Sequence, residues 1–196
     1  QLAARVIGHP AIRNMGTMGG SIAHADAAAD YPAALVAANA TVEIIGPNGK
    51  RGVPAEDYFV DYLETDLRPG ELVSCVRLPS APRGSSAAYE KFSRVAGDFA
   101  TVSVAVVLSL EGRRCREIRL ALGACAPTPV RVPEAEKILT GSALDERAIA
   151  AAAECLVAAA DPIDDFRGTA EYRLMLIPEI IRRAIDRARA NAGEKP

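Results

Sequence analysis

With 196 residues and 49% hydrophobic content, the chain is long and apolar enough to bury a core, which excludes an intrinsically disordered protein. Its formal net charge of −2 predicts no nucleic-acid partner, and 5% aromatic residues without tryptophan offer no base-stacking surface. No apolar run approaches the ~20 residues that span a bilayer and no secretory signal is evident, so we expect a cytoplasmic protein without a transmembrane segment.

Near its start the chain carries its most informative segment, residues 12–26, which reads Ile-Arg-Asn-Met-Gly-Thr-Met-Gly-Gly-Ser-Ile-Ala-His-Ala-Asp. Glycines at 16, 19 and 20 would allow positive φ and let a ligand approach the backbone closely. Thr17 and Ser21 would add hydroxyl donors to the free N–H groups of such a turn, which bind anions. The segment lacks the patterns of the nucleoside triphosphate and dinucleotide loops. It predicts a phosphate or diphosphate cradle, and an ordinary tight turn is the alternative.

The next elements form a first unit that ends near residue 80. We expect a helix over 26–38 with Asp26 as its N-cap, although Pro32 could delay its start. Further along the chain, the pattern predicts a strand over 41–45, a tight turn at 46–50, a short helix within 53–63 and a strand over 72–78.

A stretch rich in Pro, Gly and Ser at 79–86 is the clearest linker, so we divide the chain into domains of residues 1–82 and 83–196. The second unit shows three strand patterns and then three helix patterns, at 88–94, 100–110, 116–124, 133–139, 145–160 and 169–190. Strands followed by helices predict the α+β class, with a three-stranded antiparallel sheet covered by helices on one face.

The residues that usually hold metals are sparse. The chain has four well-separated cysteines, Cys75, Cys115, Cys125 and Cys155. None forms a Cys-x-x-Cys pair, and the two histidines, His9 and His24, make a poor metal site by themselves. We therefore predict no metal or iron–sulfur site in this chain and nominate no catalytic side chain.

Residues 7–38 resemble the second FAD-binding segment of the molybdenum hydroxylase flavoproteins, which comprise the medium subunits of aerobic carbon monoxide dehydrogenases and the FAD subunits of xanthine dehydrogenases. Segments at 70–73, 89–92, 97–100 and 165–173 fit the same family in the same order. The resemblance implies that residues 1–82 are the second half of a two-part FAD-binding domain of the p-cresol methylhydroxylase type. It implies that residues 83–196 are a carbon monoxide dehydrogenase flavoprotein C-terminal-like domain.

The resemblance also implies which residues would contact FAD. They form an apolar approach, a group at the diphosphate and ribityl chain, an apolar wall on the ring system and one cation near the isoalloxazine. The implied residues are Ile7, Gly8, Ile12, Gly16, Thr17, Gly19, Gly20, Ser21, Ala23, His24, Asp30, Leu72, Val73 and Lys91.

Three of these roles have plain structural alternatives. Asp30 would accept hydrogen bonds from ribityl or ribose hydroxyls, or it is an acid beside a helix N-terminus. Lys91 would stabilise negative charge on a reduced flavin, or it is a solvated strand lysine. Leu72 and Val73 would face the ring, or they are ordinary strand core.

The resemblance implies an electron-transfer subunit. It would take electrons from a small iron–sulfur partner, which a large molybdenum partner supplies, and pass them to a quinone, NAD or oxygen. The molybdenum cofactor and [2Fe-2S] clusters are expected only in those partners. The family's FAD domain has an additional N-terminal half, so we expect a fragment or a split subunit whose other half is a separate polypeptide, inactive in isolation. A non-catalytic assembly module that does not bind FAD by itself is the alternative.

Overall fold

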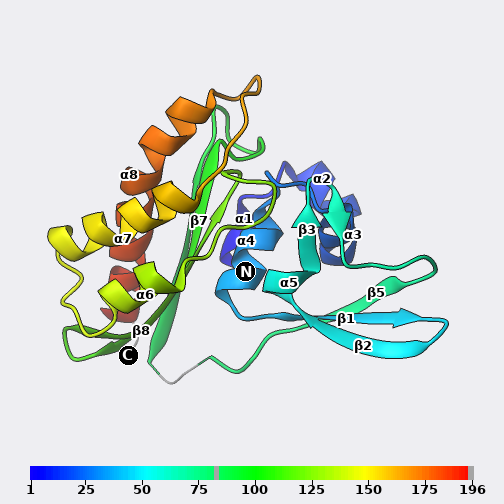
Figure 1. Cartoon of the computed structure of the whole chain (residues 1–196), viewed down its shortest axis with the longest axis horizontal. Helices are drawn as coiled ribbons and strands as arrows, with labels where there is room; N and C mark the ends of the chain where they lie inside the picture. The colour runs from blue at the N-terminus through cyan, green and yellow to red at the C-terminus, as the bar shows by residue number, and fades with distance from the viewer. Residues whose placement is uncertain (82–83, 194–196) are drawn as a thin grey trace.

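An antiparallel sheet of β6 (Ser85–Phe92), β7 (Val102–Glu111) and β8 (Arg114–Gly123) organises the computed structural model, which describes residues 1–81 and 84–193 (Figure 1). Side chains alternate between the two faces of a strand, and on β7 the buried residues Val104, Val106 and Leu108 point into one core. Three helices cover that face, namely α6 (Pro133–Leu139), α7 (Glu146–Ala159) and α8 (Ala170–Gly193). The predicted strands and helices of the second unit are therefore confirmed.

The opposite face of this sheet is covered as well, which corrects the expectation of helices on one face only. Helix α4 (Asp30–Ala37) packs there against β7 and β8, in a second core that includes Ala105 and Ala121. Small residues permit this close approach, since a Cβ built on Gly123 would lie 3.3 Å from the Cβ of Ala33. The sheet thus contributes to two cores, one shared with the C-terminal helices and the other shared with the N-terminal unit.

A smaller antiparallel sheet extends from the first unit, in the order β2 (Gly49–Pro54), β1 (Thr41–Gly46), β5 (Leu72–Arg77) (Figure 1). The short helix α5 (Ala55–Tyr58) and the pair β3 (Phe59–Asp61) and β4 (Glu64–Thr65) lie between these strands in sequence. The predicted strands, turn and short helix of the first unit are confirmed. Residues 82 and 83, where we placed the domain boundary, lie outside the described residues.

The first 40 residues are more helical than expected, with α1 (Leu2–Arg5), α2 (Pro10–Met15) and α3 (Met18–His24) ahead of α4. Asp26 does not cap α4, which begins at Asp30 with Ala29 as its N-cap. The Asp26 carboxylate instead accepts a hydrogen bond from the Ala28 amide, at 2.8 Å, and so stabilises the turn between α3 and α4. Pro32 delays the helix because the ring is tolerated only in a first turn.

No helix in the described parts of the chain combines the length and the apolarity needed to cross a bilayer.

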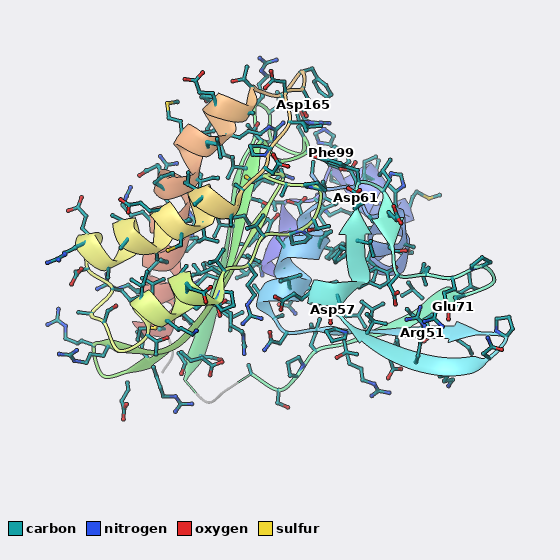
Figure 2. The ribbon with its side chains drawn as sticks, viewed as in Figure 1. Arg51, Asp57, Asp61, Glu71, Phe99 and Asp165 are labelled. Atoms are coloured by element: carbon teal, nitrogen blue, oxygen red, sulfur yellow. The ribbon has the colours of Figure 1, made fainter. Side chains whose placement is uncertain are left out.

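An ion cluster ties the small sheet to the turn that leads into β5. Arg51 of β2 donates to both carboxylate oxygens of Glu71, at 3.0 and 2.6 Å, and pairs with Asp66 (Figure 2). The hydrogen bonds from Arg51, and then that from the Arg68 amide, lower the pKa of Glu71 from 4.5 to about 2. The ionised carboxylate is thus favoured in the folded state.

This depressed pKa predicts an acid-sensitive contribution to stability. The contribution is present above pH 4.5 and is lost as the pH falls towards about 2. We expect the free energy of unfolding, measured by urea denaturation at several pH values, to fall less steeply over this window in Glu71→Gln than in the wild type. Glu154→Gln, on the exposed side of α7, is the control and should keep the wild-type slope. An unchanged slope in Glu71→Gln would contradict the assignment.

Candidate functional site

A cavity of about 730 Å³ lies between the N-terminal helices and the loop that follows β6. This volume is within the range of roughly 300–1,000 Å³ that is typical of cofactor sites. Eight of the residues singled out from the sequence line it, namely Ile7, Ile12, Gly16, Thr17, Gly20, Ser21, His24 and Asp30. The structure thus brings together most of the predicted N-terminal site.

The glycine-rich segment forms this cavity in a different way from the one predicted. Gly16 has φ −76°, and Gly19 and Gly20 lie in the first turn of α3, so the expectation of positive φ at these glycines is wrong. The reason is Thr17, whose Oγ1 accepts a hydrogen bond from the Gly20 amide at 2.9 Å and begins a helix there. A Cβ on Gly20 would lie only 3.0 Å from that Oγ1. Gly20 therefore leaves both the cap and the cavity clear of a side chain.

Six predicted residues lie elsewhere. Gly8 and Lys91 line a neighbouring cavity of about 530 Å³, whereas Gly19, Ala23, Leu72 and Val73 line neither of these two cavities. Leu72 is 69% exposed, so the alternative that it belongs to the strand core is wrong, while Val73 packs partly buried against the N-terminal core. The contact of Leu72 and Val73 with a flavin ring stays a prediction.

A buried polar cluster borders the first cavity. Lys91 Nζ donates to Asp30 Oδ2 at 2.8 Å and to the Val6 carbonyl at 3.2 Å, and the Tyr89 hydroxyl donates to Asp30 Oδ1 at 2.7 Å. The side chains of Lys91 and Asp30 are only 6% and 5% exposed. Lys91 is therefore not a solvated strand lysine, and that alternative is wrong.

Burial shifts the pKa of two groups in this cluster, Asp30 and Tyr89. Burial raises the pKa of Asp30 above its usual 3.8, while the hydrogen bonds from Lys91 and Tyr89 oppose that rise. Burial and the neighbouring Asp30 charge raise the pKa of Tyr89 well above 10, so the phenol stays protonated and donates. Asp30 does lie in the first turn of α4, as its alternative supposed, and both its oxygens have partners within the chain.

Seven further residues line the cavity without being among the predicted site residues, namely Ala4, Arg13, Met15, Asp26, Ala29, Tyr31 and Phe99. Arg13 shapes the approach to the cavity, because its Nη1 donates to the carbonyls of Ile7 and Gly8 at 2.7 and 2.8 Å. Phe99 lies in the segment 97–100 that fits the family, and this fit is the signal for it in the sequence. Gly8 itself has φ +48°, and a Cβ there would lie 2.9 Å from Ile12, so only glycine fits.

Residues 1–81 match the family described as the FAD binding domain in molybdopterin dehydrogenase, and residues 87–188 match the CO dehydrogenase flavoprotein C-terminal domain. The chain belongs to the FAD-binding medium subunits of the molybdenum hydroxylases. Its fold is shared with the Cu,Mo-CO dehydrogenase crystal structure, at a TM-score of 0.94 and 40% identity over 97% of this chain and 66% of that one. This confirms both the resemblance and the fold class.

Relatives of this medium subunit serve different complexes. The chain is 42% identical to the carbon monoxide dehydrogenase medium chain of Afipia carboxidovorans over 95% of its length and 65% of that relative. It is 43% identical to the nicotine 6-hydroxylase medium subunit of Paenarthrobacter nicotinovorans, over 96% of its length and 66% of that relative. The chain thus spans about 65% of the length of these relatives.

FAD is the cofactor of this subunit family, and the cavity suits it. Ile7, Ile12 and Phe99 provide apolar surface for a ring system, and Thr17 and Ser21 provide hydroxyl groups for polar parts of a ligand. Between them Gly20 keeps the backbone accessible, since any side chain there would be crowded by Thr17.

Proposed function

We propose that this chain is the FAD-binding electron-transfer part of a molybdenum hydroxylase and that the cavity of about 730 Å³ holds part of the FAD. The observation that supports this most strongly is the gathering, in one cavity, of eight residues nominated from the sequence. The family assignment adds the identity of the cofactor.

In this proposal the chain binds and orients while the cofactor carries electrons. FAD, when bound, accepts and releases one or two electrons. Thr17 and Ser21 would donate hydrogen bonds to its polar chain, and Ile7 and Phe99 would give apolar contact to its ring. Lys91 holds the Val6 carbonyl and the Asp30 carboxylate together, which fixes the backbone just ahead of Ile7.

The partners follow from the kind of subunit that the relatives are. Those relatives are named medium chains or medium subunits of carbon monoxide dehydrogenase and nicotine 6-hydroxylase. We propose a small partner with [2Fe-2S] clusters and a large partner with the molybdenum cofactor, where the substrate is oxidised. The electrons then leave this chain for an external acceptor such as a quinone, NAD or oxygen. The expected cytoplasmic location stays a prediction.

A further part of the proposal concerns the rest of the FAD site. The chain spans about 65% of its relatives, and two residues that line the cavity, Ile12 and Met15, are 57% and 87% exposed. We propose that a segment equivalent to the relatives' remaining third completes the site, on the same or a separate polypeptide. Residues 1–196 alone would then be inactive.

The test is the visible absorbance spectrum of purified residues 1–196, alone and after mixing with that segment and the two partner subunits. Flavin absorbance only in the mixture is the expected result. Flavin bound by residues 1–196 alone would contradict the need for a further segment while supporting the FAD site. Absence of flavin from both samples would overturn the proposal and favour the assembly module.

A further inference from the structure

Phe99 is the single contribution that the second half of the chain, as far as the structure describes it, makes to the lining of the cavity. The other lining residues lie between residues 4 and 31, whereas Phe99 comes from the loop that joins β6 and β7. Figure 2 shows it close to Asp165, on the side of the molecule where the two halves of the chain meet. The ring remains 43% exposed, so contacts within the loop do not enclose it.

The side chain of Arg167, which lies just before α8, contacts this ring. The centre of its guanidinium lies 5.1 Å from the centroid of the Phe99 ring and 4.1 Å from that of Phe166. Both distances are within the ~6 Å at which a cation is attracted to an aromatic face. The guanidinium thus stacks with two aromatic rings, and one of these lines the cofactor cavity.

Hydrogen bonds account for only part of the orientation of the Arg167 side chain. Its Nη1 lies 3.4 Å from Asp165 Oδ2, and its Nε is 4.0 Å from the Asp98 carboxylate. Among the described residues that Nε, although buried, has no hydrogen-bond partner. Stacking on the aromatic rings therefore contributes much of what orients this side chain.

The Asp165 carboxylate is fixed by several hydrogen bonds within the protein. It accepts hydrogen bonds from the amides of Arg167 and Gly168, at 2.8 and 3.2 Å, and from Arg173 Nη2 at 2.5 Å. Burial by itself would raise the pKa of Asp165, but these hydrogen bonds outweigh it and lower the pKa below its usual 3.8. Asp165 is therefore a stable anion beside two arginines.

Arg173 connects Asp165 to the central sheet. Its side chain is only 4% exposed, and its Nη1 donates to the carbonyls of Thr101 and Ala124, at 2.5 and 3.0 Å. Thr101 immediately precedes β7 and Ala124 immediately follows β8. The contacts run from the sheet through Arg173, Asp165 and Arg167 to Phe99.

We propose that Arg167 is a positioning residue for the flavin site, holding the Phe99 ring as a wall of the cavity that would contain FAD. The inference rests on the proposed function. It assigns the segment around residue 167 a role in cofactor binding, although this segment is distant in sequence from the cavity and does not line it.

The test is a double-mutant cycle in the complete complex, with FAD removed and then rebound. Arg167→Met keeps an apolar stem but removes the planar cation, and Phe99→Ala removes the ring. We expect Arg167→Met to raise the Kd for FAD about two- to fivefold, the effect of one partly exposed cation–π contact. In a Phe99→Ala background the same change should have no further effect, since Arg167 acts through that ring. The flavin midpoint potential should shift in Arg167→Met, a readout that loss of overall stability would not move.

Arg183→Met is the matched control. The Arg183 guanidinium pairs with Glu179, and both residues lie on the exposed face of α8, so this variant should leave the Kd for FAD unchanged. An unchanged Kd in Arg167→Met, or an equal rise in Kd in both backgrounds, would overturn the inference. If Arg167→Met fails to fold, Arg167→Gln, which also removes the cation, replaces it in the same cycle with the same expected rise in Kd and the same loss of that rise in the Phe99→Ala background. A wild-type complex that does not rebind FAD would overturn the proposed function and this inference together, which separates that failure from the others.

Discussion

Lys91→Met is expected to lower the free energy of unfolding by about 3–5 kcal/mol, the usual effect of removing one partner from a buried ion pair. Lys91 and Asp30 are both nearly inaccessible to water and lie 2.8 Å apart, so the variant leaves the Asp30 carboxylate buried with only the Tyr89 hydroxyl as partner. Chemical denaturation of the variant beside the wild type measures the effect. A loss below about 1 kcal/mol, the value of a surface pair, would show that the pair is solvated.

The double variant Asp30→Asn with Lys91→Met separates stability from cofactor binding. Removal of both charges should restore much of the lost stability, because no unpaired buried charge remains. Lys137→Met, on a side chain that is 78% exposed, is the surface control and should have little effect. If the double variant folds and the midpoint potential of its bound flavin is shifted, the contact of the Asp30–Lys91 pair with the flavin, which the family resemblance implies for both residues, is supported.

Gly20→Val is expected to remove flavin from the purified complex. The new Cβ would lie 3.0 Å from Thr17 Oγ1, and its two methyl groups would extend further into a region that lines the cavity. Overpacking of this kind costs about 1–3 kcal/mol, which corresponds to a Kd for FAD weaker by roughly 5- to 150-fold. The flavin-to-protein absorbance ratio measures retention, and titration of the flavin-free complex measures the Kd.

Gly19→Val is the matched control for this prediction. Gly19 lies in the same helical turn and does not line the cavity, and beyond its own helical backbone and chain neighbours a Cβ there would meet no atom within 4 Å. Flavin should therefore remain in Gly19→Val. Equal loss of flavin in both variants would indicate a general disturbance of α3, and the assignment of Gly20 to the cradle would then be wrong.

The part of the site that could be predicted is the part that is continuous in sequence. Residues 7–30 carry most of it, and a local segment with glycines, hydroxyls and a following helix is recognisable without knowledge of the fold. The same segment also shows a limit, since three glycines suggested positive φ. Thr17 instead caps a helix there, and the competition between a turn and a helix start was decided by one side chain.

Lys91, on strand β6, shows the same limit of prediction from the sequence alone. The alternation of side chains on β6 places Tyr89 and Lys91 on one face, and this could be predicted from the sequence. It does not indicate whether that face is open to water. The packing of α1 on β6 and of α4 on β7 and β8 buries the face and brings Asp30 within 2.8 Å of the lysine.

The sequence by itself determined the α+β class, the order of the strands and helices after residue 84, the family and eight of the residues that line the cavity, because local periodicity and contiguous motifs carry that information. The tertiary structure alone decided that the central sheet is covered on both faces, that Asp30 and Lys91 form a buried pair, and that Phe99 lines the cavity with Arg167 beside it. These contacts join residues separated by roughly 60 positions or more along the chain, and such pairs form only when packing of the hydrophobic cores brings distant segments together.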